Sequence, residues 1–182
     1  MTARMRWLGA LLGVSLGVGT VACDPAGSGS GSVEREGPDA TLRTHAIAPS
    51  TPTAEGLAYL RSMAEVHEHA DATRGEGRIR ALRAGLAQPV PAGLAEAEIM
   101  RLDVAARLGE ELMQTPRGGR AARDLLGPML AVDRSLPLDR ATARALVVLG
   151  DAAVATGDDA LAAGSYARSI EVMSLLRQEL EP

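Results

Sequence analysis

A Leu-Gly pair that occurs twice is the feature of this sequence that most constrains its fold. The two pairs lie 41 residues apart, and each time an alanine follows thirteen residues after the leucine. The residues are Leu108, Gly109 and Ala121 in the first copy and Leu149, Gly150 and Ala162 in the second. Small residues on successive helices let the helix axes approach closely, while the leucine fills the seam between them. Repeated at a fixed distance, this pattern predicts repeated helical hairpins.

The chain after residue 50 has the three- and four-residue spacing of apolar side chains that is typical of amphipathic helices. Proline and glycine mark the turns, and no alternation of β-branched residues indicates a strand. We expect Thr51 to cap the first helix, with Pro52 at its first position. The sequence therefore predicts an all-α domain over residues 51–182, built of three antiparallel hairpins. The predicted helices cover residues 51–72, 77–88, 91–114, 119–133, 139–156 and 158–180.

Composition limits both the core and the partners. Aromatic residues make up 2% of the chain and phenylalanine is absent, so Leu, Val, Ile, Met and Ala must build the core. The net charge is −4, and the basic residues do not gather into a stripe. Proteins that bind nucleic acid need such a basic footprint to contact the phosphates. We therefore expect no nucleic-acid partner.

The first 22 residues have the pattern of a secretory signal peptide. Arg4 and Arg6 form a positively charged start, and an apolar run of 16 residues follows. A membrane-spanning helix is the alternative, but it needs about 20 apolar residues, and several positions of this run are glycine or serine. We expect this segment to be cleaved.

Cys23 is the only cysteine and lies directly after the apolar run. The stretch TVAC, residues 20–23, resembles the lipobox of bacterial lipoproteins, although Thr20 stands where that family prefers leucine. The resemblance implies cleavage between Ala22 and Cys23 and lipidation of Cys23. An intermolecular disulfide or a free thiol is the alternative for an unpaired cysteine in an exported protein.

Residues 23–50 are rich in Gly, Ser, Pro and Thr and have no apolar period. Such a segment buries too little surface to offset its ordering entropy, so we expect a flexible linker behind the lipidated cysteine. Together with the lipobox, it implies a domain tethered to a membrane of the bacterial cell envelope. In enterobacteria, an Asp directly after the lipidated Cys marks a lipoprotein for the inner membrane, and Asp24 has that position. The rule does not extend to all bacteria, so the choice between inner and outer membrane stays open.

The predicted hairpins resemble the tetratricopeptide repeat (TPR), with copies at about residues 100–134 and 139–178. The resemblance implies an α-solenoid, and an Ala-rich helical bundle is the alternative. The first copy has Pro128 where the family has alanine, so Gly127-Pro128 should kink or shorten its second helix. Its period of 41 residues also exceeds the family's, which is about 34. Residues 53–88 lack the Leu-Gly signature. The second copy carries Leu146, Leu149, Gly150, Ala162 and Tyr166, and the first carries Leu108, Gly109, Ala121 and Leu125.

TPR proteins receive a peptide or a partner helix on the concave face formed by the first helices of their hairpins. The resemblance places six residues of this chain on that face: Asp103, Ala106, Glu110, Arg144, Val147 and Asp151. The Lys and Asn residues with which some repeats hold a terminal carboxylate are absent there. Ordinary helix surface is the alternative interpretation of each position.

Few residues offer catalytic or metal chemistry. His67 and His69, two apart on a helix, point about 200° away from each other, so they cannot share one metal ion; we interpret both as solvent-facing. His45 lies in the predicted linker, and RGEGR, residues 74–78, is interpreted as a turn and not as an anion site. We expect no catalytic site, no metal, no cofactor and no small-molecule substrate.

These observations predict a non-enzymatic, membrane-anchored lipoprotein. We expect it to act as a protein–protein interaction scaffold or assembly factor in the cell envelope, with a protein partner and a membrane contact through its N-terminal lipid. The alternatives are a structural envelope lipoprotein without a specific client, or a small metal-binding protein or enzyme that uses His67 and His69. The inference from fold to function is one of analogy.

Overall fold

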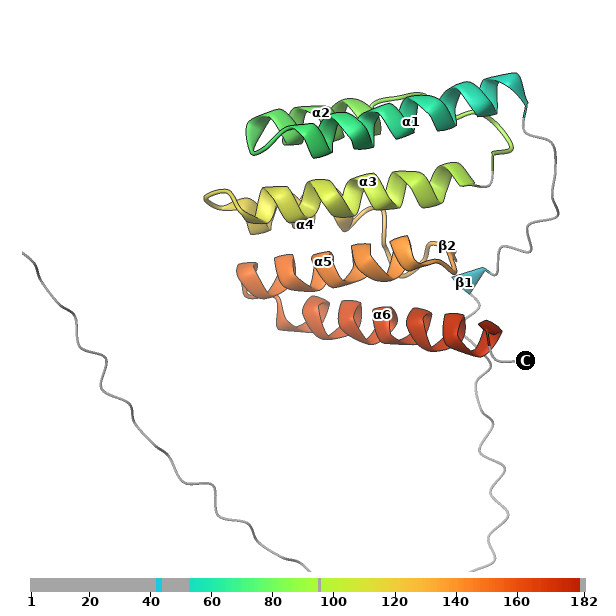
Figure 1. Cartoon of the computed structure of the whole chain (residues 1–182). Coiled ribbons are helices and arrows are strands. Elements are labelled where there is room, and N and C mark those ends of the chain that lie inside the picture. The colour runs from blue at the N-terminus through green and yellow to red at the C-terminus, as the bar shows by residue number, and fades with distance from the viewer. Residues whose placement is uncertain (1–41, 44–52, 95, 181–182) are drawn as a thin grey trace, which may run out of the picture. The chain divides into compact units, whose positions relative to one another are not determined.

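The computed structural model describes residues 42–43, 53–94 and 96–180 (Figure 1). The predicted signal peptide, Ala22, Cys23 and His45 lie outside this part of the chain. Helices form most of the described chain, so the all-α prediction is confirmed. No helix within these ranges is both long and apolar enough to cross a membrane. The helices are α1 (Ala54–Ala72), α2 (Glu76–Leu86), α3 (Glu96–Met113), α4 (Gly118–Leu126), α5 (Arg140–Thr156) and α6 (Asp159–Leu180).

Polar caps and glycines set the helix ends. α1 begins two residues later than expected, because Thr53 and not Thr51 caps it; the Thr53 hydroxyl accepts a hydrogen bond from Gly56 N at 3.0 Å. Asp139 caps α5 in the same way, accepting from Ala141 N at 2.7 Å. Gly157 ends α5 with a φ of 75°, a left-handed conformation that favours glycine.

α4 is shorter than predicted. It ends at Leu126 with Gly127 as its C-cap, although the apolar pattern extends to residue 133. Pro128 cannot donate the next helical hydrogen bond and its ring hinders the preceding turn. The expectation that Gly127-Pro128 shortens this helix is therefore confirmed.

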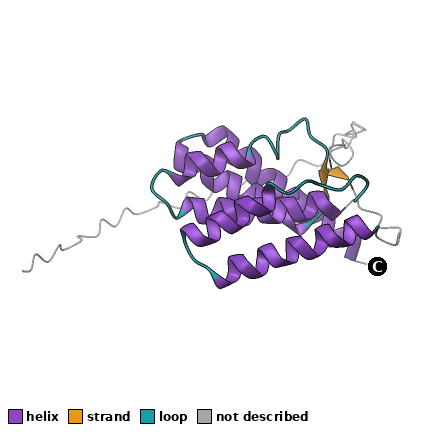
Figure 2. Cartoon of the chain, turned by 90° about the horizontal axis from the view of Figure 1, so that it is seen from above, coloured by secondary structure: helices purple, strands orange, loops and turns teal. Residues whose placement is uncertain are grey.

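Consecutive helices pack as hairpins, α1 with α2, α3 with α4 and α5 with α6, in three levels from top to bottom in Figure 1. The second helix of each hairpin also packs on the first helix of the next, α2 on α3 and α4 on α5, and α3 lies beside α5. Seen from above, the helices follow roughly one direction and their connections lie at the helix ends (Figure 2). These contacts place α1, α3 and α5 next to one another in space, in that order.

Aliphatic side chains form two adjoining core clusters, as composition requires. One joins α1, α2 and α3 around Met63, Leu82 and Leu108, and the other joins α3 to α6 around Leu102 and Leu146. Each fully buried large aliphatic side chain contributes about 1.5 to 3 kcal/mol to folding. The core is continuous along the series of hairpins because both clusters include residues of α3.

The two Leu-Gly pairs lie where helices approach closely, as predicted. A Cβ on Gly109 would lie 2.8 Å from Val148 Cγ1 and 3.1 Å from Leu126 Cδ1. A Cβ on Gly150 would lie 2.5 Å from Tyr166 Cε1, below any ordinary contact distance. Leu108 and Leu149 are both buried in the seams.

The alanines of the two copies behave differently. Ala162 is buried as predicted, but Ala121 is exposed, and the prediction for it is wrong. The fully buried residue is Ala122, which shares the inner face of α4 with Leu126, four residues on. α4 starts at Gly118, directly after the left-handed Arg117, and this start sets the rotation of the helix.

The first hairpin has a close approach of its own, on its second helix. A Cβ on Gly85 of α2 would lie 2.7 Å from Val66 Cγ1 of α1. The hairpin at residues 53–88 therefore also has a glycine where its two helices approach closely, although its sequence contains no Leu-Gly pair.

A short strand pair was not expected. β1 (Leu42–Arg43) pairs in parallel with β2 (Leu136–Pro137), with Leu42 opposite Leu136. β1 falls inside the segment predicted as linker, so these two residues are held against the loop that precedes α5. Two residues are too few to show a strand pattern in the sequence.

Candidate functional site

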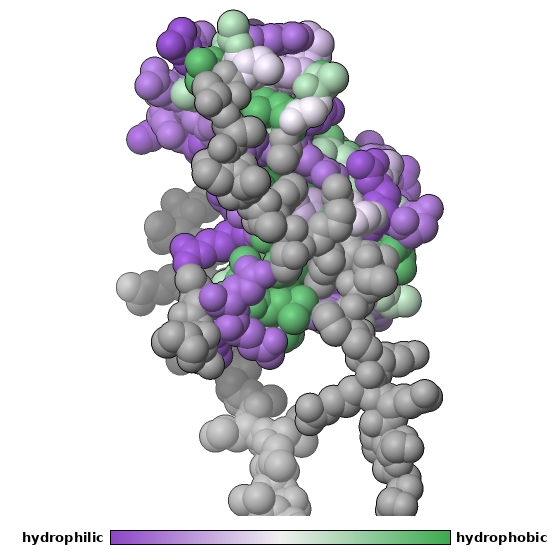
Figure 3. All heavy atoms as spheres, turned by 90° about the vertical axis from the view of Figure 1, so that its right-hand side faces the viewer, coloured by the Kyte–Doolittle hydropathy of each residue, from purple (hydrophilic) through white to green (hydrophobic). Residues whose placement is uncertain are grey.

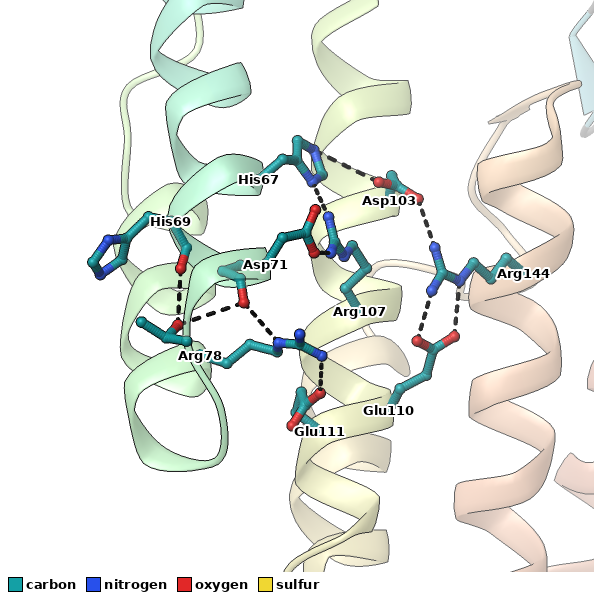
Figure 4. Close-up of polar contacts among 11 residues, drawn as sticks. His67, His69, Asp71, Arg78, Asp103, Arg107, Glu110, Glu111 and Arg144 are labelled. Atoms are coloured by element: carbon teal, nitrogen blue, oxygen red, sulfur yellow. Dashed lines mark hydrogen bonds and ion pairs between the residues drawn. The ribbon is translucent and has the colours of Figure 1, made fainter.

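Three of the six residues predicted for a partner face lie together on α3 and α5. The Arg144 guanidinium of α5 donates to both carboxylate oxygens of Glu110 on α3, at 2.8 Å from Nε and 2.6 Å from Nη2. Its Nη1 donates to Asp103 Oδ1, about two turns before Glu110 on α3, at 3.2 Å. A bidentate pair with a second carboxylate is the strongest geometry available to arginine. Arg144 thus fixes α5 against α3 (Figure 4).

The network continues from Asp103 to α1. Asp103 Oδ2 lies 3.6 Å from His67 Nε2, and His67 Nδ1 lies 2.6 Å from Arg107 Nη1. Arg107 also pairs with Asp71 of α1. The interpretation of His67 as solvent-facing is therefore wrong, because its half-buried ring lies between an arginine and a carboxylate. His69, by contrast, is exposed and points away from this cluster (Figure 4).

Six side chains thus form one connected group across the first helices of all three hairpins. We call this group the charge ladder; its members are Asp71, His67, Arg107, Asp103, Arg144 and Glu110. Its charges nearly balance, with three carboxylates against two guanidiniums and one imidazole. The hydrogen bonding of Arg144 to the Glu110 carboxylate is the main cause that raises the pKa of Arg144, and the negative charges of Glu110 and Asp103 raise it further. Arg144 stays cationic at every physiological pH.

A separate pair holds the turn between α1 and α2. Arg78 Nη1 donates to Glu111 Oε1 of α3 at 2.7 Å, and Arg78 Nε donates to the Ala70 carbonyl at 2.7 Å. Gly75 has a φ of 52°, which fits the expected turn at residues 74–75, but Glu76–Arg78 already belong to α2. Because Arg78 is engaged within the chain, it is not available to an external anion here.

The other three predicted residues have different surroundings. Ala106 is fully buried in the core between α3 and α5, so its side chain does not reach a partner face. Val147 of α5 is 41% exposed. Asp151, one turn further along, accepts a hydrogen bond from the Tyr166 hydroxyl at 2.6 Å. This hydrogen bond is the main cause that raises the pKa of Tyr166.

Sequence reasoning missed the contribution of α1 and one apolar residue of α5. His67 and Asp71 are four residues apart on α1, and Asp103 and Arg107 are four apart on α3, so each pair lies on one helix face. That spacing could have predicted two polar helix faces, one on α1 and one on α3. Only the structure shows that these two faces lie against each other. Val154 is 56% exposed and shares a face of α5 with Val147, seven residues before it.

A cleft of about 460 Å³ opens at the end of the helical unit where α3 begins. Its apolar lining includes Val90, Leu94 and Met129, and Arg134 lies 3.8 Å from Glu98 at its side. Figure 3 views this end, where apolar side chains gather at the level of α5 and α6 between hydrophilic ones. No three potential metal-ligating residues cluster anywhere in the described ranges.

Comparisons with models of known protein families, with curated proteins and with solved structures find no match. The class that the fold defines is an all-α protein of consecutive helical hairpins.

Proposed function

We propose that this protein is a lipid-anchored scaffold or assembly factor of the bacterial cell envelope, and that its hairpins form a TPR-like α-solenoid. It binds a protein partner on the face formed by α1, α3 and α5. The observation that carries the proposal is the alignment of these three helices by the charge ladder, which leaves apolar side chains of α5 exposed beside it. The packing of each second helix on the next first helix also supports an array.

The charge ladder stabilises the shape of the face more than it binds a partner. Arg144 and Arg107 already have carboxylate partners, so an incoming acidic group would have to displace Glu110 or Asp71. Exchanging one ion pair for another yields little net free energy. We therefore expect the partner's charges to add specificity at the edges and little affinity.

Affinity comes instead from Val147 and Val154. Burying a fully exposed valine side chain contributes about 1.5 kcal/mol; because these two are 41% and 56% exposed on one face of α5, covering both contributes about that much in total. A partner helix with apolar residues seven apart matches that spacing. The proposed client is therefore an amphipathic helix or peptide.

The anchor rests on TVAC and the composition of residues 1–50. Lipidation of Cys23 with two or three acyl chains holds a protein at a membrane, whereas a single chain holds it only marginally. The intact mass of protein extracted from membranes should correspond to a chain that begins at an acylated Cys23. A chain that begins at unmodified Met1 would contradict the anchor, independently of the partner face.

The partner face is tested by cross-linking the full-length protein in its native membranes and identifying what is captured. The wild type is compared with Val147→Asp and Val154→Asp, which place a charge on the proposed docking surface. Val132→Asp is the matched control, because Val132 is exposed in the loop after α4. Arg144→Ala is less suitable, since it also disrupts the ladder.

A defined partner that is captured by the wild type and the control, and lost from both α5 variants, would support the proposal. Capture that is equal in all four proteins would place the contact elsewhere. No reproducible partner for any of them would favour a structural lipoprotein without a client.

A further inference from the structure

α6 carries an apolar stripe that the rest of the described chain does not cover. Ile170 is 68% exposed and Met173 is 45% exposed, high values for large apolar side chains. The side of α6 that packs on α5 is formed by Ala162, Ser165, Ser169 and Val172, all of them buried, and the ring of Tyr166 at its edge lies against Gly150 of α5. Ser169 marks its direction, since its hydroxyl donates to the Ala143 carbonyl of α5 at 3.0 Å.

The stripe has the spacing of a coiled-coil seam. Its residues follow one another at steps of four, three, four, three and four, and we call them the α6 seam: Asp159, Ala163, Tyr166, Ile170, Met173 and Arg177. Alternating steps of three and four keep side chains on one line of a helix that faces a second helix. Tyr166 lies at the border of the seam, half-buried, with its hydroxyl held by Asp151.

The α6 seam is complementary to itself when two copies run in opposite directions. With the two-fold axis at the height of Arg168, small Ala163 faces large Met173 of the second copy, and Tyr166 faces Ile170. At both ends of the seam, Asp159 faces Arg177 of the second copy. In a parallel pair, each charge would instead face its own kind, which is unfavourable.

We propose that two copies of this protein associate through antiparallel packing of their α6 seams. Apolar pairs fill the middle of the interface and two Asp–Arg pairs close its ends, as in an isologous dimer. Anchoring to one membrane would raise the local concentration of the copies and favour the dimer. The inference uses residues other than Val147 and Val154 of the proposed docking surface; only the contribution of the membrane rests on the proposed lipid anchor.

Sedimentation of the full-length protein extracted in detergent tests the dimer. We expect a dimer for the wild type and for the control Val132→Asp, and a monomer for Ile170→Asp, whose carboxylates would lie against Tyr166 in the interface. Circular dichroism shows whether each variant keeps its helices. A monomeric wild type, or a folded Ile170→Asp chain that stays dimeric, would overturn the proposal.

Cysteine cross-linking in membranes tests the direction of the pair. A chain with both Ala163→Cys and Met173→Cys should form an intermolecular disulfide on oxidation, because the two positions face each other across the axis. Ala163→Cys alone should not, since its two copies would be about 15 Å apart along the helices, beyond disulfide reach. The wild type gives the background of Cys23. Equal cross-linking by the single variant would overturn the antiparallel arrangement.

A charge exchange gives an independent test of the seam's ends. Asp159→Arg should weaken the dimer about tenfold, and the double variant Asp159→Arg with Arg177→Asp should restore it. If the double variant is no tighter than the single one, these residues do not face each other.

Discussion

The first helices of the first and the last hairpin, α1 and α5, contact the middle hairpin in different ways. In the first hairpin, α1 contacts α3 through the polar side chains of His67 and Asp71, while α2 packs on α3 within an apolar cluster that all three helices share. α5 meets α3, α4 and α6 through a nearly continuous apolar surface, to which Arg144 adds ion pairs with α3 and Asp151 adds a hydrogen bond with α6. The N-terminal hairpin is therefore attached by the apolar packing of α2 on α3, and the charge ladder adds to the orientation of α1, whereas the C-terminal hairpin is joined to the rest of the core mainly by apolar surface.

Loss of the core around α5 should have the largest effect. Leu146 is fully buried at the centre of the α3–α6 cluster, and Leu146→Ala should lower the free energy of unfolding by about 2 to 5 kcal/mol. Val147→Ala, next in sequence but exposed, is the control and should cost well under half of that. Urea unfolding followed by circular dichroism measures both, and equal losses would contradict the assignment of this core.

The close approaches in the first and last hairpins should respond alike to an added methyl group. Gly150→Ala places a Cβ against Tyr166 and Gly85→Ala against Val66, and overpacking costs about 1 to 3 kcal/mol at each site. Removing the opposing side chain tests the cause: Tyr166→Ala should cost less in a Gly150→Ala background than alone, and Val66→Ala less with Gly85→Ala. Additive losses in a double-mutant cycle would show that the contact is not the reason.

The first hairpin shows what the sequence could and could not predict. Most helix positions followed from the spacing of apolar residues and from Pro128, which acts locally. The buried Gly109 and Gly150 followed from their repeat. Gly85 did not, because its neighbour Val66 belongs to a helix whose register is set only by tertiary packing. The burial of Ala121 could not be predicted for the same reason. Rotating α4 by one residue position decides whether Ala121 or Ala122 faces the core, and tertiary packing sets that rotation.

The partner face shows the same limit. Arg144, Asp103 and Glu110 were assigned to one face by resemblance, and the structure brings them together. Ala106 was placed on that face as well, but one residue position on a helix turns a side chain by about 100°, enough to move it into the core. His67 was judged by its neighbour His69, whereas its actual partners are about 40 residues away in sequence.

The charge ladder should contribute less than either packing effect. Arg107→Ala removes the contacts with His67 and Asp71, and we expect a loss of about 1 kcal/mol, because partly exposed ion pairs are screened by water. Most of this loss should disappear at high salt. Hydrogen exchange gives the local readout: amides of α1 and α2 should exchange faster in Arg107→Ala while those of α5 stay protected. Uniform acceleration would contradict a role confined to the first hairpin.

Tyr59 should make the first hairpin sensitive to alkaline pH. Its hydroxyl is buried and has no hydrogen-bond partner within the described residues, and burial raises the pKa of Tyr59. A raised pKa in the folded state means that stability is fully present below the pKa of an unfolded tyrosine, about 10, and falls as the pH rises above it. Tyr59→Phe should reduce this alkaline loss and, by removing an unsatisfied hydroxyl, match or slightly exceed wild-type stability at neutral pH. Urea unfolding at pH 7 and pH 10.5 measures both effects, and an unchanged alkaline loss would contradict the assignment.

The smallest expected effect distinguishes two glycines of the same hairpin. Gly164 lies inside α6, and a Cβ there would meet nothing within 4 Å, in contrast to the Tyr166 ring that faces Gly150. Glycine in a helix interior costs about 0.5 to 1 kcal/mol relative to alanine. Gly164→Ala should therefore stabilise the chain by about that amount, while Gly150→Ala destabilises it. Both substitutions are Gly→Ala within the α5–α6 hairpin and change the intrinsic helix propensity equally. The opposite signs of their effects on the free energy of unfolding therefore measure the cost of the close approach at Gly150. If Gly164→Ala were destabilising, α6 would have a covered surface at that position, and the boundaries of the α6 seam would have to be widened to include it.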